Sequence, residues 1–260
     1  MKSLKNWLLV LSVLSCFGCS SPVHEDGRGC AFVSDSIQYR VEFMSEGCVR
    51  ILSFPEGDTL VTKRLVVDSQ KPAFKDYKWK DTGQQLIFST RELSVAFDKE
   101  DAAFTFQEVS TGKLLLKEKG AKKARHFKRS VTGGEQCLEV TQRFVPTDDE
   151  AIYGLGQYQN GIMNYRGKSV LLLQANMDIV NPFLISTNGY GILWDNYSST
   201  KFEDTKEGYS FTSEVGDASD YYFVYGKNMD EVVAGYRELT GDVPMFGKWV
   251  YGCLLYTSDA

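Results

Sequence analysis

Histidine is scarce in this sequence, with two residues, His24 and His126, among 260. Neither has a second potential ligand at the spacing of a metal site. Of the six cysteines, no set has the spacing of a zinc motif or of a dense disulfide framework. A phosphate-binding glycine loop is also missing, because Gly154-x-Gly156 lacks a third glycine and a following helical pattern. We therefore expect no metal ion and no cofactor.

Positive charge is in short supply as well. Lys and Arg number 29 against 34 Asp and Glu, which gives a net charge of −5 and a pI near 5.2. Binding to nucleic acid needs clustered Lys and Arg, so a nucleic-acid partner is not expected. Lys and Arg are clustered in one segment, residues 117–129. We interpret it as a solvated loop between strands, with an anionic-ligand patch as the alternative.

A long apolar run occurs only at the N-terminus. Met1–Gly18 has two lysines, an apolar stretch and then small residues, which is the pattern of a secretory signal too short to span a bilayer. Val13-Leu14-Ser15-Cys16 matches a bacterial lipoprotein cleavage box, and Cys19 follows a poorer match. The alternative is a plain secreted protein.

Lipid chains on such a cysteine would hold the protein to a membrane. We expect a signal peptide and anchor over residues 1–21 and a polar tether over 22–35. The location would be the periplasm or the outer membrane of a Gram-negative-type bacterium.

No helical period appears before residue 228, whereas period-two alternation recurs throughout. Ile37, Tyr39, Val41 and Phe43 alternate with polar residues, as in a half-buried strand. Short strands separated by frequent turn signals predict an antiparallel β-sandwich over residues 36–226. Residues 151–202, which we call the central segment, contain three short apolar strand candidates: Val170–Leu173, Pro182–Ile185 and Gly191–Trp194.

One helix is predicted after this sandwich. Asn228 precedes Glu231 by three residues, the pattern of an N-cap with a carboxylate at N3. Gly241 is placed as a C-terminal cap and Pro244 prevents continuation. The apolar face consists of four residues: Val232, Val233, Tyr236 and Leu239.

Four cysteines lie beyond the export signal: Cys30, Cys48, Cys137 and Cys253. We interpret each as a small buried apolar residue. An exported protein permits disulfides, and Cys30–Cys48 pairing is one possibility.

Four sequence blocks in the central segment occur in a specific order. They read YGLGQ from Tyr153, NYRGK from Asn164, NPFLIS from Asn181 and GYGILWDN from Gly189. Together they resemble glycoside hydrolase family 31, and its bacterial α-xylosidase-type members most of all. The resemblance extends over residues 37–252, and four spaced blocks are far more specific than a lone YGLG.

The resemblance implies a galactose-mutarotase-like N-terminal sandwich followed by a catalytic (β/α)₈ barrel. Residues 227–252 would be a linker helix and the start of that barrel, whose first strand begins at Lys248–Gly252. The family hydrolyses α-glycosides with retention, using an aspartate nucleophile and an aspartate acid/base on barrel loops. No position here matches either motif, so no catalytic residue is assigned. The acidic cluster Asp148–Glu150 is interpreted as a turn.

After Gly252 the sequence departs from the family. The octapeptide from Cys253 to Ala260 resembles the translation of a sequencing-library adapter. We expect it to be an artificial tail on a truncated gene.

In the resembled family, a loop of the sandwich helps to line the subsite for the non-reducing sugar. The corresponding turn here carries Gln174, Asn176 and Asp178, whose amides and carboxylate suit sugar hydroxyls. The alternative is an ordinary polar hairpin. For Tyr165, Arg166 and Trp194, packing or interdomain contact is as good an interpretation as sugar contact.

The functional hypothesis is part of an α-xylosidase, or next an α-glucosidase. Its partners would be an oligosaccharide substrate such as a xyloglucan fragment and a membrane, with oligomers possible in the complete protein. The alternatives are a lipid-anchored carbohydrate-binding sandwich without hydrolase activity and a purely structural sandwich.

Overall fold

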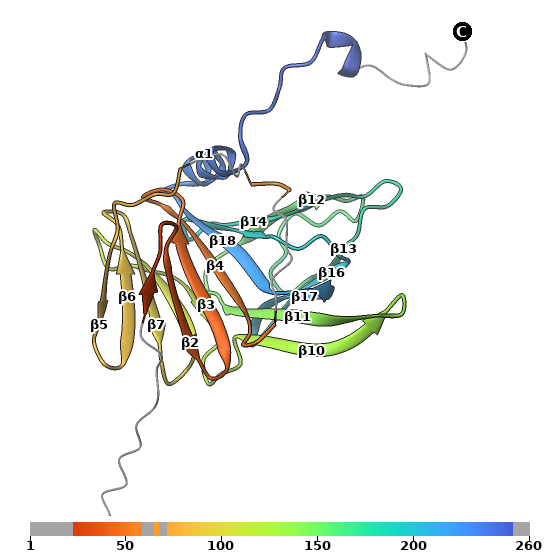
Figure 1. Cartoon of the computed structure of the whole chain (residues 1–260). Helices are drawn as coiled ribbons and strands as arrows, with labels where there is room; N and C mark the ends of the chain where they lie inside the picture. Colours follow the sequence, from red (N-terminus) through yellow and green to blue (C-terminus); the bar gives the residue numbers. More distant parts are fainter. Residues whose placement is uncertain (1–22, 59–64, 68–71, 252–260) are drawn as a thin grey trace, which may run out of the picture.

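The chain folds into two antiparallel β-sheets that pack against each other (Figure 1). The computed structural model describes residues 23–58, 65–67 and 72–251. The expected signal peptide and anchor at 1–21 and the expected tail at 253–260 lie outside the described residues. The predicted β-sandwich is confirmed.

One sheet has eight strands and contains both ends of the sandwich sequence. Its order across the sheet is β1 (His24–Glu25), β2 (Cys30–Ser34), β3 (Ile37–Phe43), β4 (Cys48–Pro55), β18 (Ser219–Tyr225), β15 (Tyr190–Trp194), β14 (Ile179–Ser186) and β12 (Ile152–Gln157).

The other sheet has ten strands. Its order is β13 (Ser169–Leu172), β16 (Thr200–Thr205), β17 (Gly208–Gly216), β11 (Glu135–Val145), β9 (Leu114–Glu118), β8 (Ala103–Glu108), β7 (Leu93–Asp98), β6 (Gln85–Ser89) and β5 (Lys78–Asp81), with β10 (Arg125–Thr132) paired to β11. The three strand candidates of the central segment correspond to β13, β14 and β15.

The main core lies between the sheets and is rich in aromatic rings. Side chains alternate between the two faces of a strand, so Tyr221 and Phe223 of β18 face this core. The Phe223 ring stacks on Phe106 of β8 in the opposite sheet with 4.2 Å between ring centroids. Their neighbours Tyr222 and Val224 belong to a second apolar cluster on the outer face of the eight-stranded sheet.

The predicted helix is present as α1 (Met229–Thr240) and covers this second cluster. Asn228 is the N-cap, with its side-chain oxygen accepting from the Glu231 amide at 2.9 Å, and Gly241 is the C-cap. Val232 and Leu239 are buried as predicted, whereas Val233 is 40% exposed. The prediction for Val233 was wrong because the buried stripe of this helix is narrow. Within the described residues no helix is long and apolar enough to span a membrane.

The tether prediction was wrong for most of residues 22–35. From His24 to Ser34 the chain forms the hairpin β1–β2, and Phe32 is buried in the main core. Asp26 makes the turn, since its carboxylate accepts from the Arg28 and Gly29 amides and from Arg40 Nη2 at 2.6 Å. The hydrogen bond from Arg40 holds the pKa of Asp26 well below its usual range. The polar composition of this segment therefore reflects a built turn.

Of the predicted barrel strand Lys248–Gly252, the structure describes Lys248–Tyr251. Lys248–Tyr251 forms a 3₁₀-helix, and Trp249 is 84% exposed. A strand of a parallel barrel depends on hydrogen bonds to its neighbours in that barrel. The described part of this chain supplies no such neighbour.

The cysteines follow their predicted role in two cases. Cys30 lies in the main core and Cys48 in the outer cluster, so the sheet separates them and they form no disulfide with each other. Cys137 is half-buried, which corrects the prediction of a buried residue for that position. Cys253 lies outside the described residues.

Candidate functional site

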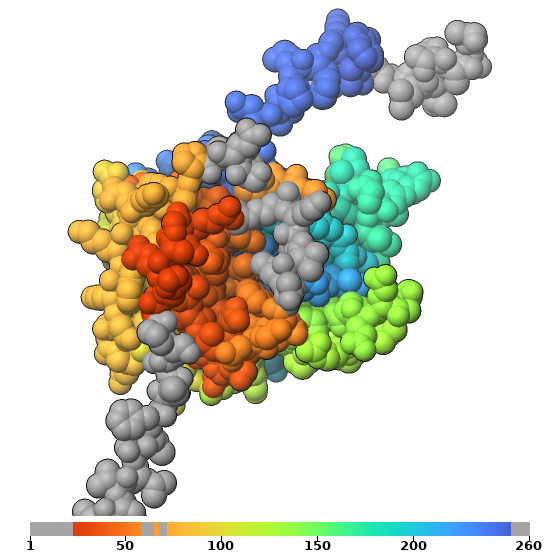
Figure 2. Space-filling model, viewed as in Figure 1, coloured from red at the N-terminus to blue at the C-terminus, as the bar shows by residue number. Residues whose placement is uncertain are grey.

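The loop of residues 173–178, between β13 and β14, crosses from one sheet to the other. β13 is the edge strand of the ten-stranded sheet, whereas β14 belongs to the eight-stranded sheet. The two strands therefore do not pair with each other. The teal segments that join β12, β13 and β14 project from the right side of the molecule (Figures 1 and 2).

The loop has a defined local structure. Ala175 and Asp178 exchange two backbone hydrogen bonds, with N–O distances of 3.4 and 3.2 Å. Met177 has φ +68°, which lets the chain reverse between them. The Gln174 side-chain oxygen accepts from the Val180 amide at 3.1 Å and so ties the loop to β14.

The three candidate residues are thus brought together on one loop, but they are not equivalent. Gln174 and Asn176 are exposed and Asp178 is half-buried. Since the Gln174 oxygen already holds the loop, its amide nitrogen is the part left for a ligand. Asn176 and Asp178 offer their side-chain oxygens and, for Asn176, two N–H donors.

A pocket of about 350 Å³ lies beside this loop. Leu173 and Gln174 contribute one wall, and Asp195–Thr200 contributes another. Asn176 and Asp178 do not line it. The sequence did not lead us to place Asp195 and Asn196 in a pocket. An acid followed by an amide directly after a buried strand is the signal that could have indicated it.

Tyr165 and Trp194 are packing residues. Trp194 is fully buried, stacks on Phe211 and donates its Nε1–H to Ser213 Oγ at 2.9 Å. Tyr165 is 3% exposed and meets the edge of the Phe202 ring. Neither ring is available to stack on a sugar.

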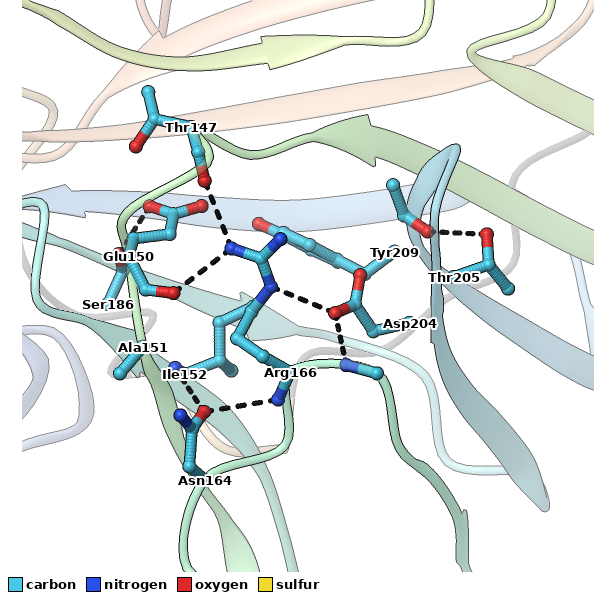
Figure 3. Close-up of polar contacts among 12 residues, drawn as sticks. Thr147, Glu150, Ala151, Ile152, Asn164, Arg166, Ser186, Asp204, Thr205 and Tyr209 are labelled. Carbon is cyan, nitrogen blue, oxygen red and sulfur yellow. Dashed lines mark hydrogen bonds and ion pairs between the residues drawn. The ribbon is translucent and has the colours of Figure 1, made fainter.

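Arg166 is the centre of a polar cluster at the base of the projecting loops (Figure 3). Its Nε donates to Asp204 Oδ2 at 2.9 Å, and its Nη1 donates to the carbonyl oxygens of Thr147 and Glu150, each at 3.0 Å. The arginine of the NYRGK block therefore holds backbone together within this domain.

Glu150 is a buried carboxylate, 6% exposed. It accepts from Ser186 Oγ at 2.6 Å and from the Tyr190 hydroxyl at 3.0 Å. Burial raises the pKa of Glu150, and these hydrogen bonds offset only part of that rise. Asp148 and Asp149 form the predicted turn, and Glu150 at its end is buried because its partners come from strands β14 and β15.

Replacing Glu150 with Gln should remove a pH dependence from folding stability. A raised pKa means that folded Glu150 keeps its proton at a pH where the unfolded chain, with a pKa near 4.5, has lost it. The free energy of unfolding of the wild type should therefore fall, relative to Glu150→Gln, as pH rises from about 4.5 to the folded pKa, and then stay level. Denaturant unfolding of both proteins across this pH range is the measurement. A difference that is constant with pH, or that changes in the opposite direction, would contradict the assignment.

In the basic segment 117–129, residues 119–124 form the predicted loop between strands, and the residues on either side of this loop belong to strands. The segment contains the end of β9 and the start of β10. Arg125 is 6% exposed on its side chain and paired with buried Glu118, Lys122 is paired with Asp35, and Arg129 with Asp58. Since each of these three cations has a carboxylate partner, the segment does not favour an anionic ligand. Within the described residues no three His, Cys, Asp or Glu side chains come together to hold a metal ion.

Comparison with known proteins places this geometry in a family. Residues 38–203 match the family model described as the glycosyl hydrolase 31 N-terminal galactose mutarotase-like domain. The α-xylosidase of Saccharolobus solfataricus is 34% identical in an alignment of 232 positions that covers 84% of this chain and 30% of that protein. The α-glucosidase 2 of Bacillus thermoamyloliquefaciens is 27% identical over 85% of this chain and 29% of its own length.

The fold agrees with these sequence matches. A crystal structure of the family 31 α-xylosidase from Xanthomonas citri superposes with a TM-score of 0.79 and 21% identity, covering 88% of this chain and 41% of that one. This chain therefore spans about a third of the length of the curated relatives named above. The resemblance seen in the four sequence blocks is confirmed: the chain belongs to glycoside hydrolase family 31, with residues 38–203 matching its N-terminal galactose mutarotase-like domain.

Proposed function

We propose that this chain is the N-terminal domain of a retaining, exo-acting α-glycosidase that releases non-reducing-end sugars from oligosaccharides. The α-xylosidase activity is favoured because a named α-xylosidase is 34% identical over 84% of the chain. A matching α-glucosidase at 27% identity makes α-glucosidase the second candidate. Xyloglucan fragments are the proposed substrate class.

The domain's contribution is proposed to be a wall of the sugar subsite. Exposed Asn176, half-buried Asp178 and the amide group of Gln174 stand on a loop that projects from the sandwich. The catalytic carboxylates are proposed to lie on a barrel that follows this domain in the complete protein. The 260-residue chain alone is then expected to hydrolyse no glycoside.

Anchoring of the protein to a membrane through Cys16, or alternatively Cys19, remains part of the proposal. Its support is the sequence pattern alone, because both residues lie outside the described part of the chain. The intact mass of the N-terminal peptide from natively produced protein would show which cysteine carries lipid.

The test of the proposal is activity of the complete gene product. The locus is amplified from source DNA, the uninterrupted reading frame is expressed, and hydrolysis of p-nitrophenyl α-xyloside and α-glucoside is measured. We expect turnover of the xyloside with the higher kcat/KM. A frame that stops at Ala260, or a longer product inactive on both compounds, would contradict the enzyme proposal.

The binding-module alternative predicts a different result. Calorimetric titration of the 260-residue chain with xyloglucan oligosaccharides should then release or absorb heat without any hydrolysis. The leading proposal requires turnover by the longer protein, so the two experiments separate the two functions.

A further inference from the structure

Three residues directly before β13 and one residue of β16 join the β12–β13 loop to the ten-stranded sheet. Asp204 of β16 accepts on Oδ2 from Arg166 Nε at 2.9 Å and from the Gly167 amide at 2.6 Å, and its own amide donates to the Lys168 carbonyl at 2.8 Å. We call Arg166, Gly167, Lys168 and Asp204 the clasp. It fixes the β12–β13 loop to the ten-stranded sheet.

The same loop is fixed to the eight-stranded sheet by the two residues before Arg166, Asn164 and Tyr165. Asn164 Oδ1 accepts from the Ile152 amide and the Arg166 amide, each at 3.1 Å, and the Tyr165 amide donates to the Ile152 carbonyl at 2.8 Å. Arg166 adds the Thr147 and Glu150 carbonyls (Figure 3). The clasp therefore sets how the edges of the two sheets meet.

The position of the clasp in the chain connects it to the candidate site. β13 (Ser169–Leu172) starts directly after Lys168, pairs with β16 and ends two residues before Gln174. A four-residue edge strand is short, so its register on β16 depends strongly on what holds its start. The loop of residues 173–178 follows β13 directly and leads into β14.

We propose that Arg166 and Asp204 are positioning residues for the loop of residues 173–178. The clasp holds β13 at the place on β16 from which Asn176 and Asp178 face the sugar. The effect of this positioning on sugar binding rests on the proposed function.

Because Arg166 and Asp204 form a partly buried ion pair, a suitable variant must change the position of the loop without destabilising the whole domain. The Asp204 side chain is 2% exposed, and its Oδ1 has no hydrogen-bond partner in the described residues. Removing Arg166 alone would leave a buried charge and destabilise the whole domain. Removing both charges, as in Arg166→Met/Asp204→Leu, avoids that penalty and still breaks the contacts that hold the start of β13.

The test is hydrogen exchange of the 260-residue chain, with Arg91→Met as the control. Arg91 is an exposed arginine that pairs with Glu46 at 2.6 Å, in the turn between β6 and β7. In the double variant, the amides of Ala175, Asp178 and Val180 should exchange about tenfold faster or more, while those of β15 and β18 stay within about twofold of wild type. Unchanged exchange in the loop, or an equal increase in all strands, would overturn the proposal.

A second arm uses the longer active protein. There the double variant should raise KM about tenfold with kcat within about twofold, because displacing the loop removes binding that the ground state and the transition state share. Arg166→Lys keeps the charge and loses the hydrogen bonds to the Thr147 and Glu150 carbonyls, so its KM should lie between those of the wild type and the double variant. If the wild-type longer protein hydrolyses no α-glycoside, the proposed function fails, and hydrogen exchange still decides whether the clasp positions the loop. An active double variant with wild-type KM would overturn the positioning role.

Discussion

Replacing Glu118 with alanine should lower the free energy of unfolding by about 3–5 kcal/mol, the usual loss when one partner of a buried ion pair is removed. The Glu118 side chain is fully buried between the sheets. It accepts from the Phe104 amide at 2.7 Å, Gln142 Nε2 at 2.8 Å and the Tyr221 hydroxyl at 2.9 Å, and it pairs with Arg125. Its removal leaves these donors and a buried guanidinium without their acceptor.

Chemical denaturation of purified variants measures this effect. Glu207→Ala is the matched control. Glu207 is 85% exposed and its Oε2 lies 3.5 Å from Lys119 Nζ, and such an exposed ion pair contributes at most about 1 kcal/mol to the free energy of unfolding. The double variant Glu118→Leu/Arg125→Met should recover much of the loss, since apolar side chains can replace a buried ion pair. A loss for Glu118→Ala no greater than for Glu207→Ala would show that the network does not hold the sheets together.

Replacing Gly156 with alanine should destabilise the domain by about 3 kcal/mol or more, combining roughly 1–3 for backbone strain and a similar amount for steric overlap. Gly156 has φ +121°, and an added Cβ would lie 2.1 Å from the Ile179 carbonyl oxygen. The register of β12 on β14 shifts between Gly154 and Gly156, so the glycines of the YGLGQ block allow a bulge there.

Gly161→Ala separates strain from overlap. Gly161 also has positive φ, +69°, but no atom lies within 4 Å of an added Cβ, so its cost should be about 1–2 kcal/mol. If Gly156→Ala and Gly161→Ala have equal free energies of unfolding, β14 moves to accommodate the added methyl group, and the bulge does not require glycine for steric reasons.

Local patterns in the sequence identified much of the sandwich. The alternation of Ile37, Tyr39, Val41 and Phe43 predicted β3, and Asn228 with Gly241 marked the ends of α1. Such signals lie within one element, so they can be seen without tertiary structure.

What escaped prediction depends on partners far away in the chain. Glu150 looked like part of a polar turn, yet it is buried by Tyr190, 40 residues later. Arg166 pairs with Asp204, which lies 38 residues later in the chain. The polar residues around Asp26 predicted a tether, whereas they form the turn between β1 and β2. The candidate loop itself was located by resemblance, and its crossing between two sheets was visible only in the structure.

The central claim is that this sandwich supplies a wall of the sugar subsite, and kinetics of loop variants in the longer protein test it most directly. Asn176→Ala/Asp178→Ala should lower kcat/KM for the α-xyloside by about 100-fold, roughly tenfold for each lost hydrogen bond. The control is Lys80→Ala/Gln84→Ala, two exposed residues on the β5–β6 hairpin at the opposite edge of the ten-stranded sheet. The control should keep the kcat/KM of the wild type. If the wild-type longer protein is active and Asn176→Ala/Asp178→Ala has the same kcat/KM, the account is contradicted.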